Sequence, residues 1–293
     1  MFRQKLINWS ILILLSLIWG SSFILMKKGL RSFNSIQIAS LRIFISYLFL
    51  LPVALSNIRR INRGNILSLI IIGFIGSAFP AFLYPFAQRE IDSSVAGMLN
   101  SLTPLFTLLT GIIIYRRQAK WNQVAGIMLG LTGAAGLLYR GSLSFDVMGL
   151  LIVLATFFYG ISTNQVTLIK GMNGVVITSL AFFIIGPFAG ISLLVSDFGP
   201  ALETENWLQN LGFISILSIF GSGIALMLFN VLIIRTSPVY AVTVTYLAPL
   251  VSTLWGFYDG ESITPFMIIS VICILAGVYL TIRRKPGSKA VKE

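Results

Sequence analysis

The chain has 293 residues, of which 56% are hydrophobic and only 10% are charged, and it carries a net charge of +12. Soluble globular chains carry about 25% charged residues, so this composition excludes a soluble protein and indicates an all-α integral membrane protein. The sequence holds no histidine and a single cysteine, Cys273, which excludes a disulfide within the chain. Because the commonest metal ligand and general base is missing, we predict no metal site, no cofactor and no enzymatic activity.

Ten apolar runs follow one another along the chain, each long enough to cross a hydrocarbon core of ~30 Å as a helix. The predicted spans cover residues 8–27, 34–55, 65–85, 92–114, 121–139, 147–169, 175–196, 210–234, 238–258 and 264–282. The first run starts like a signal peptide, but it lacks a small-residue cleavage site and continues through Trp19. We therefore expect it to remain as the first span of a multi-pass protein in a bacterial inner membrane.

The distribution of charge predicts the orientation of these spans in the lipid bilayer. With the N-terminus inside, 15 basic residues fall in inner segments and five in outer ones, while eight of the nine acidic residues fall outside. This bias is the positive-inside rule, and it predicts that both termini are cytoplasmic. Residues 283–293 then form a basic cytoplasmic tail. Since the positive charge serves orientation, we expect no nucleic-acid partner.

The second half of the chain repeats features of the first. Leu102-Thr103-Pro104-Leu105 matches Leu247-Ala248-Pro249-Leu250 at an offset of 145 residues, and Trp19-Gly20-Ser21 matches Tyr159-Gly160-Ile161. These matches predict two five-helix repeats, residues 8–140 and 147–282. Because five is odd, the second repeat starts on the opposite side of the membrane, and the two repeats are inverted. Inverted repeats are typical of secondary transporters, whose substrate site lies near the midplane at the repeat interface.

The same motifs carry a resemblance to a known family. They are Trp19-Gly20-Ser21-Ser22-Phe23, Leu41-Arg42-Ile43-Phe44, Leu102-Thr103-Pro104-Leu105, Leu247-Ala248-Pro249-Leu250 and Gly260-Glu261. Over nearly its whole length the chain resembles the bacterial drug/metabolite transporter superfamily, EamA type. The resemblance implies export of amino acids or related small metabolites through ten helices with cytoplasmic termini. One position departs from the family pattern: the acid common after the fourth span is replaced by Tyr115-Arg116-Arg117, whereas Glu261 keeps its counterpart in the second repeat.

Polar side chains near the middle of a span are the candidates for contact with a solute, because unpaired polar groups are costly in hydrocarbon. The predicted substrate-binding residues are Trp19, Ser22, Tyr84, Asn100, Thr103, Tyr159, Thr163, Asn230, Thr245 and Tyr246. We expect the cavity to be centred on Trp19, Asn100, Tyr159 and Tyr246. The alternative role for each of them is packing or hydrogen bonding between helices.

Three further residues are predicted to act in hinges or gating. Pro104 and Pro249 each lack an N–H and so leave a carbonyl free near the midplane; the alternative is a kink that a nearby hydroxyl or helix repairs. Arg42 is the only basic residue well inside a span, where a charge costs roughly 2.5 to 3.5 kcal/mol. It either attracts a substrate carboxylate or fixes a hinge by bonding backbone carbonyls. Its place on the second span, away from the polar midplane faces, favours the hinge.

The transport mechanism is suggested by what the spans lack. No acid or histidine lies near a span centre, which favours facilitated movement by alternating access over proton antiport. A passive channel is a second alternative. Gly126, Gly130 and Gly133 in the fifth span predict close helix packing, either within a monomer or in a homodimer.

Overall fold

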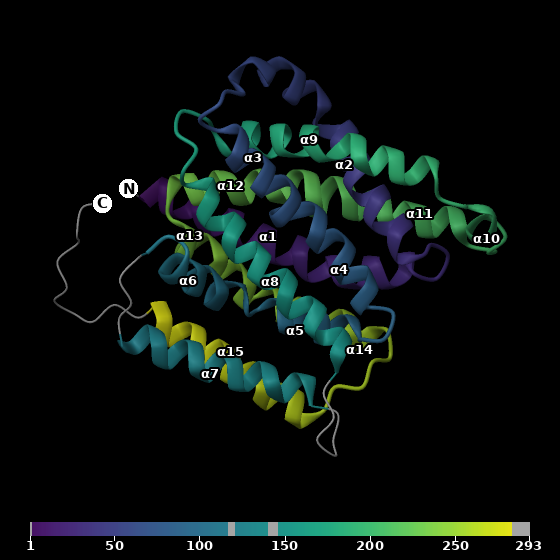
Figure 1. Cartoon of the computed structure of the whole chain (residues 1–293). Helices are drawn as coiled ribbons and strands as arrows, with labels where there is room; N and C mark the ends of the chain where they lie inside the picture. Colours follow the sequence, from purple (N-terminus) through teal and green to yellow (C-terminus); the bar gives the residue numbers. More distant parts are fainter. Residues whose placement is uncertain (1, 117–120, 140–145, 283–293) are drawn as a thin grey trace.

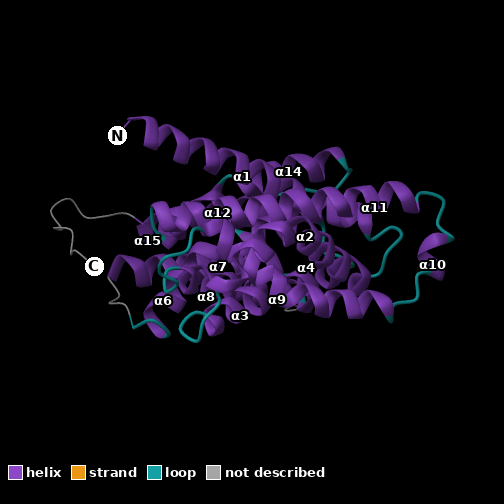
Figure 2. Ribbon diagram, turned by 90° about the horizontal axis from the view of Figure 1, so that it is seen from above, coloured by secondary structure: helices purple, strands orange, loops and turns teal. Residues whose placement is uncertain are grey.

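The computed structural model describes residues 2–116, 121–139 and 146–282, which form helices joined by loops (Figures 1 and 2). The first half contains α1 (Phe2–Gly29), α2 (Ser35–Asn57), η1 (Ile58–Arg60), α3 (Ile66–Gly73), η2 (Phe74–Ala78), α4 (Phe79–Ala87), α5 (Ser93–Asn100), α6 (Thr103–Ile113) and α7 (Trp121–Leu138). The second half contains α8 (Val147–Val166), α9 (Gly174–Leu194), α10 (Gly199–Leu202), α11 (Trp207–Ile216), η3 (Leu217–Ile224), α12 (Ala225–Arg235), α13 (Pro238–Ala241), η4 (Val242–Tyr246), α14 (Ala248–Tyr258) and α15 (Pro265–Ile282). The predicted basic tail, 283–293, lies outside the described residues.

Among the described residues, eight helical stretches are long and apolar enough to cross a membrane. They are Leu6–Gly29, Ser35–Arg60, Ile66–Ala87, Ser93–Ile113, Val147–Val166, Gly174–Leu194, Trp207–Arg235 and Pro238–Tyr258. The predicted fifth and tenth spans correspond to α7 and to a shorter apolar helix, Pro265–Leu280, within α15. These two helices pack side by side along the lower edge of Figure 1. Ten spans and the orientation of the termini stay predictions.

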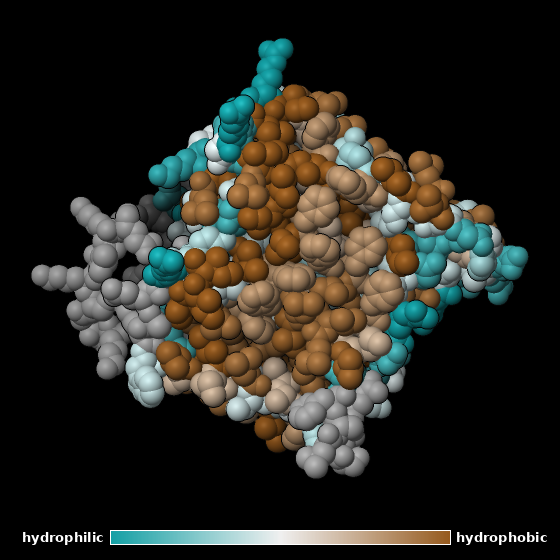
Figure 3. Space-filling model, viewed as in Figure 1, coloured by the Kyte–Doolittle hydropathy of each residue, from teal (hydrophilic) through white to brown (hydrophobic). Residues whose placement is uncertain are grey.

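The outer surface of the bundle is apolar. Figure 3 shows hydrophobic residues across the middle of one face, with hydrophilic residues towards its margins. Large side chains such as Leu67, Leu194 and Phe257 are 65%, 87% and 70% exposed. A continuous apolar surface of this kind is a liability in water but is required in contact with lipid.

Two of the long helical stretches contain a π-helical turn at matched positions. η2 lies between α3 and α4, and η3 lies between α11 and α12. Gly76 in η2 and Gly221, the first of two glycines in η3, are separated by the same 145 residues as Pro104 and Pro249. π-helical turns inside longer helices occur frequently at functional sites, which makes these two turns candidates for one.

Glycines at matched positions also allow close helix packing between the two halves. A Cβ on Gly20 in α1 would lie 2.8 Å from the carbonyl oxygen of Ala248 in α14. A Cβ on Gly160 in α8 would lie 2.6 Å from the carbonyl carbon of Phe106 in α6. The first predicted span therefore packs on the ninth in the way that the sixth packs on the fourth. A duplicated unit predicts this arrangement, in which the first helix of each half packs on the fourth helix of the other half.

The fourth and ninth predicted spans are both interrupted just before their proline. α5 ends at Asn100 and α6 begins at Thr103, while η4 ends at Tyr246 and α14 begins at Ala248. The Thr103 hydroxyl donates to the Asn100 carbonyl at 2.8 Å. This is the repaired kink that the sequence left open as an alternative at Pro104. A hinge role for either proline stays a prediction.

The glycine series of α7 packs within the chain. A Cβ on Gly133 would lie 2.5 Å from the carbonyl oxygen of Ser270 in α15. One on Gly277 of α15 would lie 2.5 Å from the carbonyl oxygen of Gly126. The small residues of both helices thus let the backbones touch, as the monomer alternative predicts.

Candidate functional site

A cavity lies between the two halves of the chain, with about 1060 Å³ of free space including its open part. Nine of the ten predicted substrate-binding residues line it: Trp19, Ser22, Tyr84, Asn100, Thr103, Tyr159, Thr163, Asn230 and Thr245. Neither Pro104 nor Pro249 is among the lining residues.

Tyr246 is the one predicted substrate-binding residue that the structure does not bring to the cavity. Its ring packs against the main hydrophobic cluster, and its hydroxyl is buried without a described hydrogen-bond partner. The preceding residue, Thr245, lines the cavity instead. Successive side chains of a 3-10 helix point about 120° apart, so only one of these two neighbours in η4 can face the same space.

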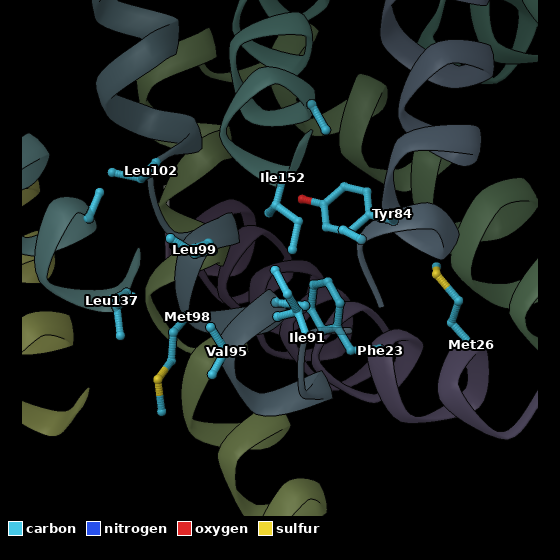
Figure 4. Packing of buried hydrophobic residues seen from close by; sticks show 14 of the residues in the cluster. Phe23, Met26, Tyr84, Ile91, Val95, Met98, Leu99, Leu102, Leu137 and Ile152 are labelled. Atoms are coloured by element: carbon cyan, nitrogen blue, oxygen red, sulfur yellow. The ribbon is translucent and has the colours of Figure 1, made fainter. Parts of the chain in front are cut away.

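One wall of the cavity is aromatic. The Tyr84 hydroxyl donates to Asn100 Oδ1 at 2.7 Å, and its ring stacks on Tyr159 with centroids 6.1 Å apart. Phe23 lies on another side of Tyr84, with centroids 5.7 Å apart; Figure 4 shows Tyr84, Phe23 and Met26 with the apolar residues packed behind them. Such a wall favours ligands with an apolar or planar body.

Trp19 is held in place by the second half of the chain. Its indole Nε1 donates to the carbonyl of Gly221 in η3 at 3.0 Å, and its ring meets Phe229 edge-to-face at 5.0 Å. The π-helical turn thus supplies a backbone acceptor at the cavity. This contact couples α1 to η3 and fixes the orientation of the indole.

Arg42, on α2, also lines the cavity and is 9% exposed. Its Nε donates to Ser222 Oγ at 2.6 Å, and it also shares a hydrogen bond with Tyr159. The hinge reading favoured by the sequence supposed bonds to backbone carbonyls, whereas the bonds described here go to side chains. Among the described lining residues, Arg42 is the only charged one.

Sequence reasoning missed several polar lining residues, namely Ser77, Ser162, Thr178 and Ser222. A signal was present, because Ser77 and Ser222 are separated by 145 residues and each follows the glycine of a π-helical turn. The two turns pack alike. A Cβ on Gly76 would clash with the Ser162 hydroxyl, and one on Gly221 would lie 2.9 Å from Ser22 Oγ.

A cluster of charges lies at one end of the bundle, which we call the acidic end. The Glu261 carboxylate accepts from Ser93 N at 3.0 Å, from Ser93 Oγ at 2.6 Å and from Ser94 N at 2.9 Å, and it pairs with Lys27 Nζ at 2.7 Å. It thereby caps the N-terminus of α5, where a negative charge is stabilised. Burial opposes ionisation, but Lys27 and the two serines outweigh it and lower the pKa of Glu261 from 4.5 to about 2.

The remaining members of the cluster are Lys28, Arg31, Asp259 and Asp92. Asp259 pairs with Lys28 and, at 2.9 Å, with Lys27; although burial opposes it, the bonds from the lysines lower the Asp259 pKa. Burial, reinforced by the charge of Glu261, raises the pKa of Asp92. The cluster ties the ends of α1, α5 and α14 together.

The opposite end of the bundle lacks the corresponding acid. The position 145 residues before Glu261 is Arg116, whose backbone is left-handed with φ of 53°. Ser237 caps α13 there by accepting from Tyr240 N at 3.2 Å. Arg117 lies outside the described residues. The two ends thus differ in their charged groups, with a buried carboxylate at the acidic end and an arginine at the matching position of the other.

Within the described ranges, no three His, Cys, Asp or Glu side chains are grouped so that they could hold a metal ion. The lining of the cavity consists of hydroxyls, amides, aromatic rings, apolar groups and one guanidinium. This set can bind a solute through hydrogen bonds, ring contacts and one positive charge.

Comparison with known proteins identifies relatives that are membrane transporters. The chain is 27% identical to an uncharacterized inner membrane transporter, YedA of Escherichia coli, covering 95% of this chain and 94% of the relative. It is 25% identical to an uncharacterized transporter of Archaeoglobus fulgidus and 24% identical to the S-adenosylmethionine/S-adenosylhomocysteine transporter of Chlamydia trachomatis, covering 99% and 85% of those chains. A crystal structure of a protein with 16% sequence identity shares the fold, with a TM-score of 0.65 over 94% of this chain and 96% of that one.

The EamA-like transporter family matches this chain twice in succession, at residues 7–139 and 147–283. The two matches together span nearly the whole protein, and no enzyme family is implied by them. The chain therefore belongs to the EamA-like transporter family of the drug/metabolite transporter superfamily and is a multi-pass membrane transporter.

Proposed function

We propose that this transporter exports amino acids or related small metabolites across the bacterial inner membrane by facilitative alternating access. One observation carries the proposal: both halves of the chain line the cavity, and its described lining is rich in hydroxyl and amide groups, with aromatic rings, one guanidinium and no carboxylate. Amino acids carry groups that match each part of this lining. The Chlamydia relative, named for two amino-acid derivatives, supports the same class.

Alternating access is supported by the matched features of the two halves. The π-helical turns, the glycines that contact the partner half and the broken helices occur once in each half. Two units of similar structure and opposite orientation have two nearly equivalent arrangements, in which the cavity opens to one side or the other. The positive-inside bias places the acidic end in the periplasm and the termini in the cytoplasm.

The facilitative mechanism is supported by the position of the titratable carboxylates. Proton antiport requires a titratable group that alternates its access between the two sides, and no Asp or Glu lines the cavity in the described part of the chain. Glu261 is the acid with the most bonds, but its partners hold it at the acidic end. Proton antiport is the alternative that the experiment separates.

The experiment is counterflow of labelled amino acids into liposomes that contain the purified protein, with and without a pH gradient. We expect saturable counterflow that the gradient does not change. Alanine at Trp19, Asn100 or Tyr159 should impair it without lowering the amount of protein in the membrane. Tyr246→Ala is the matched control for Tyr159→Ala, since Tyr246 does not line the cavity. Normal transport by all three cavity variants would refute the placement of the site.

A further inference from the structure

We propose that Arg42 binds a carboxylate of the transported solute, so that the cavity selects anions and zwitterions over cations. The inference rests on the proposed transport function and names the substrate class of the same site. It reverses the hinge role that the sequence favoured. Three observations carry it: the missing counter-charge, the free donors of the guanidinium and the asymmetry of the cavity.

The charge of Arg42 has no counter-ion among the described residues. The four ion pairs of the described structure all lie at the acidic end and involve Lys27, Lys28 or Arg31. Arg42 itself is 9% exposed and contacts neutral partners, Ser222 and Tyr159. A buried charge without a partner is unfavourable, and an incoming carboxylate supplies the missing negative charge.

The guanidinium of Arg42 has more N–H donors than its described partners accept. A planar guanidinium has five N–H donors, and the hydrogen bond to Ser222 Oγ uses only the donor on Nε. Since the side chain lines the cavity, its remaining donors can form a bidentate bond with a carboxylate, which is stronger than a neutral hydrogen bond.

Arg42 also breaks the symmetry of the cavity. Ser77 occupies the position in η2 that Ser222 occupies in η3, yet its hydroxyl donates only to the backbone carbonyl of Ile72, at 3.4 Å. The positive charge therefore lies on the η3 side, while the stacked Tyr84 and Tyr159 form an aromatic wall. A solute with a carboxylate and an apolar side chain can place the carboxylate against Arg42 and the side chain against the aromatic wall.

The test compares ligands that share one apolar body and differ in charge. The first set is L-phenylalanine, 3-phenylpropionate, L-phenylalaninamide and phenethylamine; the second contains the corresponding leucine compounds. Binding to the purified protein is followed by thermal stabilisation and by the fluorescence of Trp19, which lines the cavity, after the other four tryptophans are replaced by phenylalanine. This readout is independent of transport. Counterflow of the same compounds is measured in parallel.

The variants are Arg42→Gln and Arg42→Lys, with Arg31→Gln as the matched control. Arg31 is an arginine whose side chain is 60% exposed at the acidic end, outside the cavity. Arg42→Lys keeps the charge without the planar fork and should retain part of the preference. Ser222→Ala keeps the arginine but removes its anchor, which separates loss of charge from loss of position.

In the wild-type protein we expect carboxylates to bind about tenfold or more tightly than the matched amide and amine. Arg42→Gln should abolish this preference, and Arg31→Gln should keep it. Equal binding of amines and carboxylates, a preserved preference in Arg42→Gln, or no binding by any carboxylate would overturn the assignment. Carboxylate binding without counterflow would instead sink the proposed transport function and leave the assignment standing.

Discussion

Replacing Glu261 by glutamine should open the acidic end of the bundle. The carboxylate joins α14 to the N-terminus of α5 through Ser93 and Ser94, and to α1 through Lys27. Its side chain is 2% exposed, so few contacts with water can replace these bonds. Glutamine keeps the size of the side chain but removes the charge that pairs with Lys27 and with the α5 terminus.

The free energy that the Glu261 charge contributes follows from its pKa, which is lowered from 4.5 to about 2. A shift of this size corresponds to about 3 kcal/mol in favour of the charged form, and solvent screening at the end of the bundle reduces it to about 1–2 kcal/mol. The stabilisation is complete above pH 4.5 and is lost as the pH falls through about 2, because the folded-state pKa is the lower one. At neutral pH its loss changes the closed-to-open ratio by about 5- to 30-fold.

The assay uses a single cysteine introduced into the cavity lining, next to the charge cluster of the acidic end. Cys273 is the only native cysteine, so Cys273→Ser gives a clean background. Met26 lines the cavity on α1 next to Lys27 and is 1% exposed. In Met26→Cys the rate of labelling by a membrane-impermeant maleimide in whole cells reports access from the periplasm. Glu261→Gln should raise this rate.

The matched control is Glu203→Gln, the same chemical change at an exposed residue just after α10. It should leave the labelling rate unchanged. The reasoning is refuted if Glu261→Gln labels no faster than this control, because the cluster then does not hold the acidic end closed.

Two further predictions concern stability, each with a matched control. Gly160→Ala should lower the midpoint of thermal unfolding, because the added Cβ would lie 2.6 Å from the backbone of Phe106. The control, Gly212→Ala, should leave the midpoint unchanged, because Gly212 has open space around it. Equal midpoints for the two variants would contradict the close packing of α8 on α6. Tyr84→Phe should cost about 1 kcal/mol, since it leaves Asn100 Oδ1 without its donor, while Tyr246→Phe removes a hydroxyl that has no described partner and should be neutral. Equal effects of the two tyrosine variants in thermal unfolding would show that the Tyr84 bond contributes nothing.

Depth and polarity in the sequence predicted most of the cavity. Trp19 and Tyr159 lie at matched depths in related spans, and Asn100 lies one turn before a proline, so each could be placed near the midplane from its position along a helix. The structure brings all three to the same cavity. Their shared depth could be predicted because a membrane fixes the depth of every residue in a span, and substrate binding by them stays a prediction.

The rotation of each helix about its axis could not be predicted in the same way. Arg42 was assigned to a hinge because it lies on the second span, away from the spans with polar midplane faces, yet the structure turns its side chain to the cavity. Thr245 and Tyr246 were both expected at the cavity because they precede Pro249 near the midplane, whereas the 3-10 turn η4 presents only Thr245. The π-helical turns at Gly76 and Gly221 depend on tertiary packing, and their short Gly-Ser signal is common in membrane helices.

The central claim is tested most directly by counterflow of a labelled amino acid into liposomes containing the wild-type protein. The account predicts saturable uptake driven by unlabelled substrate inside, equal in the presence and absence of a pH gradient. Uptake that never saturates would contradict alternating access, and accumulation that requires the proton gradient would contradict the facilitative mechanism.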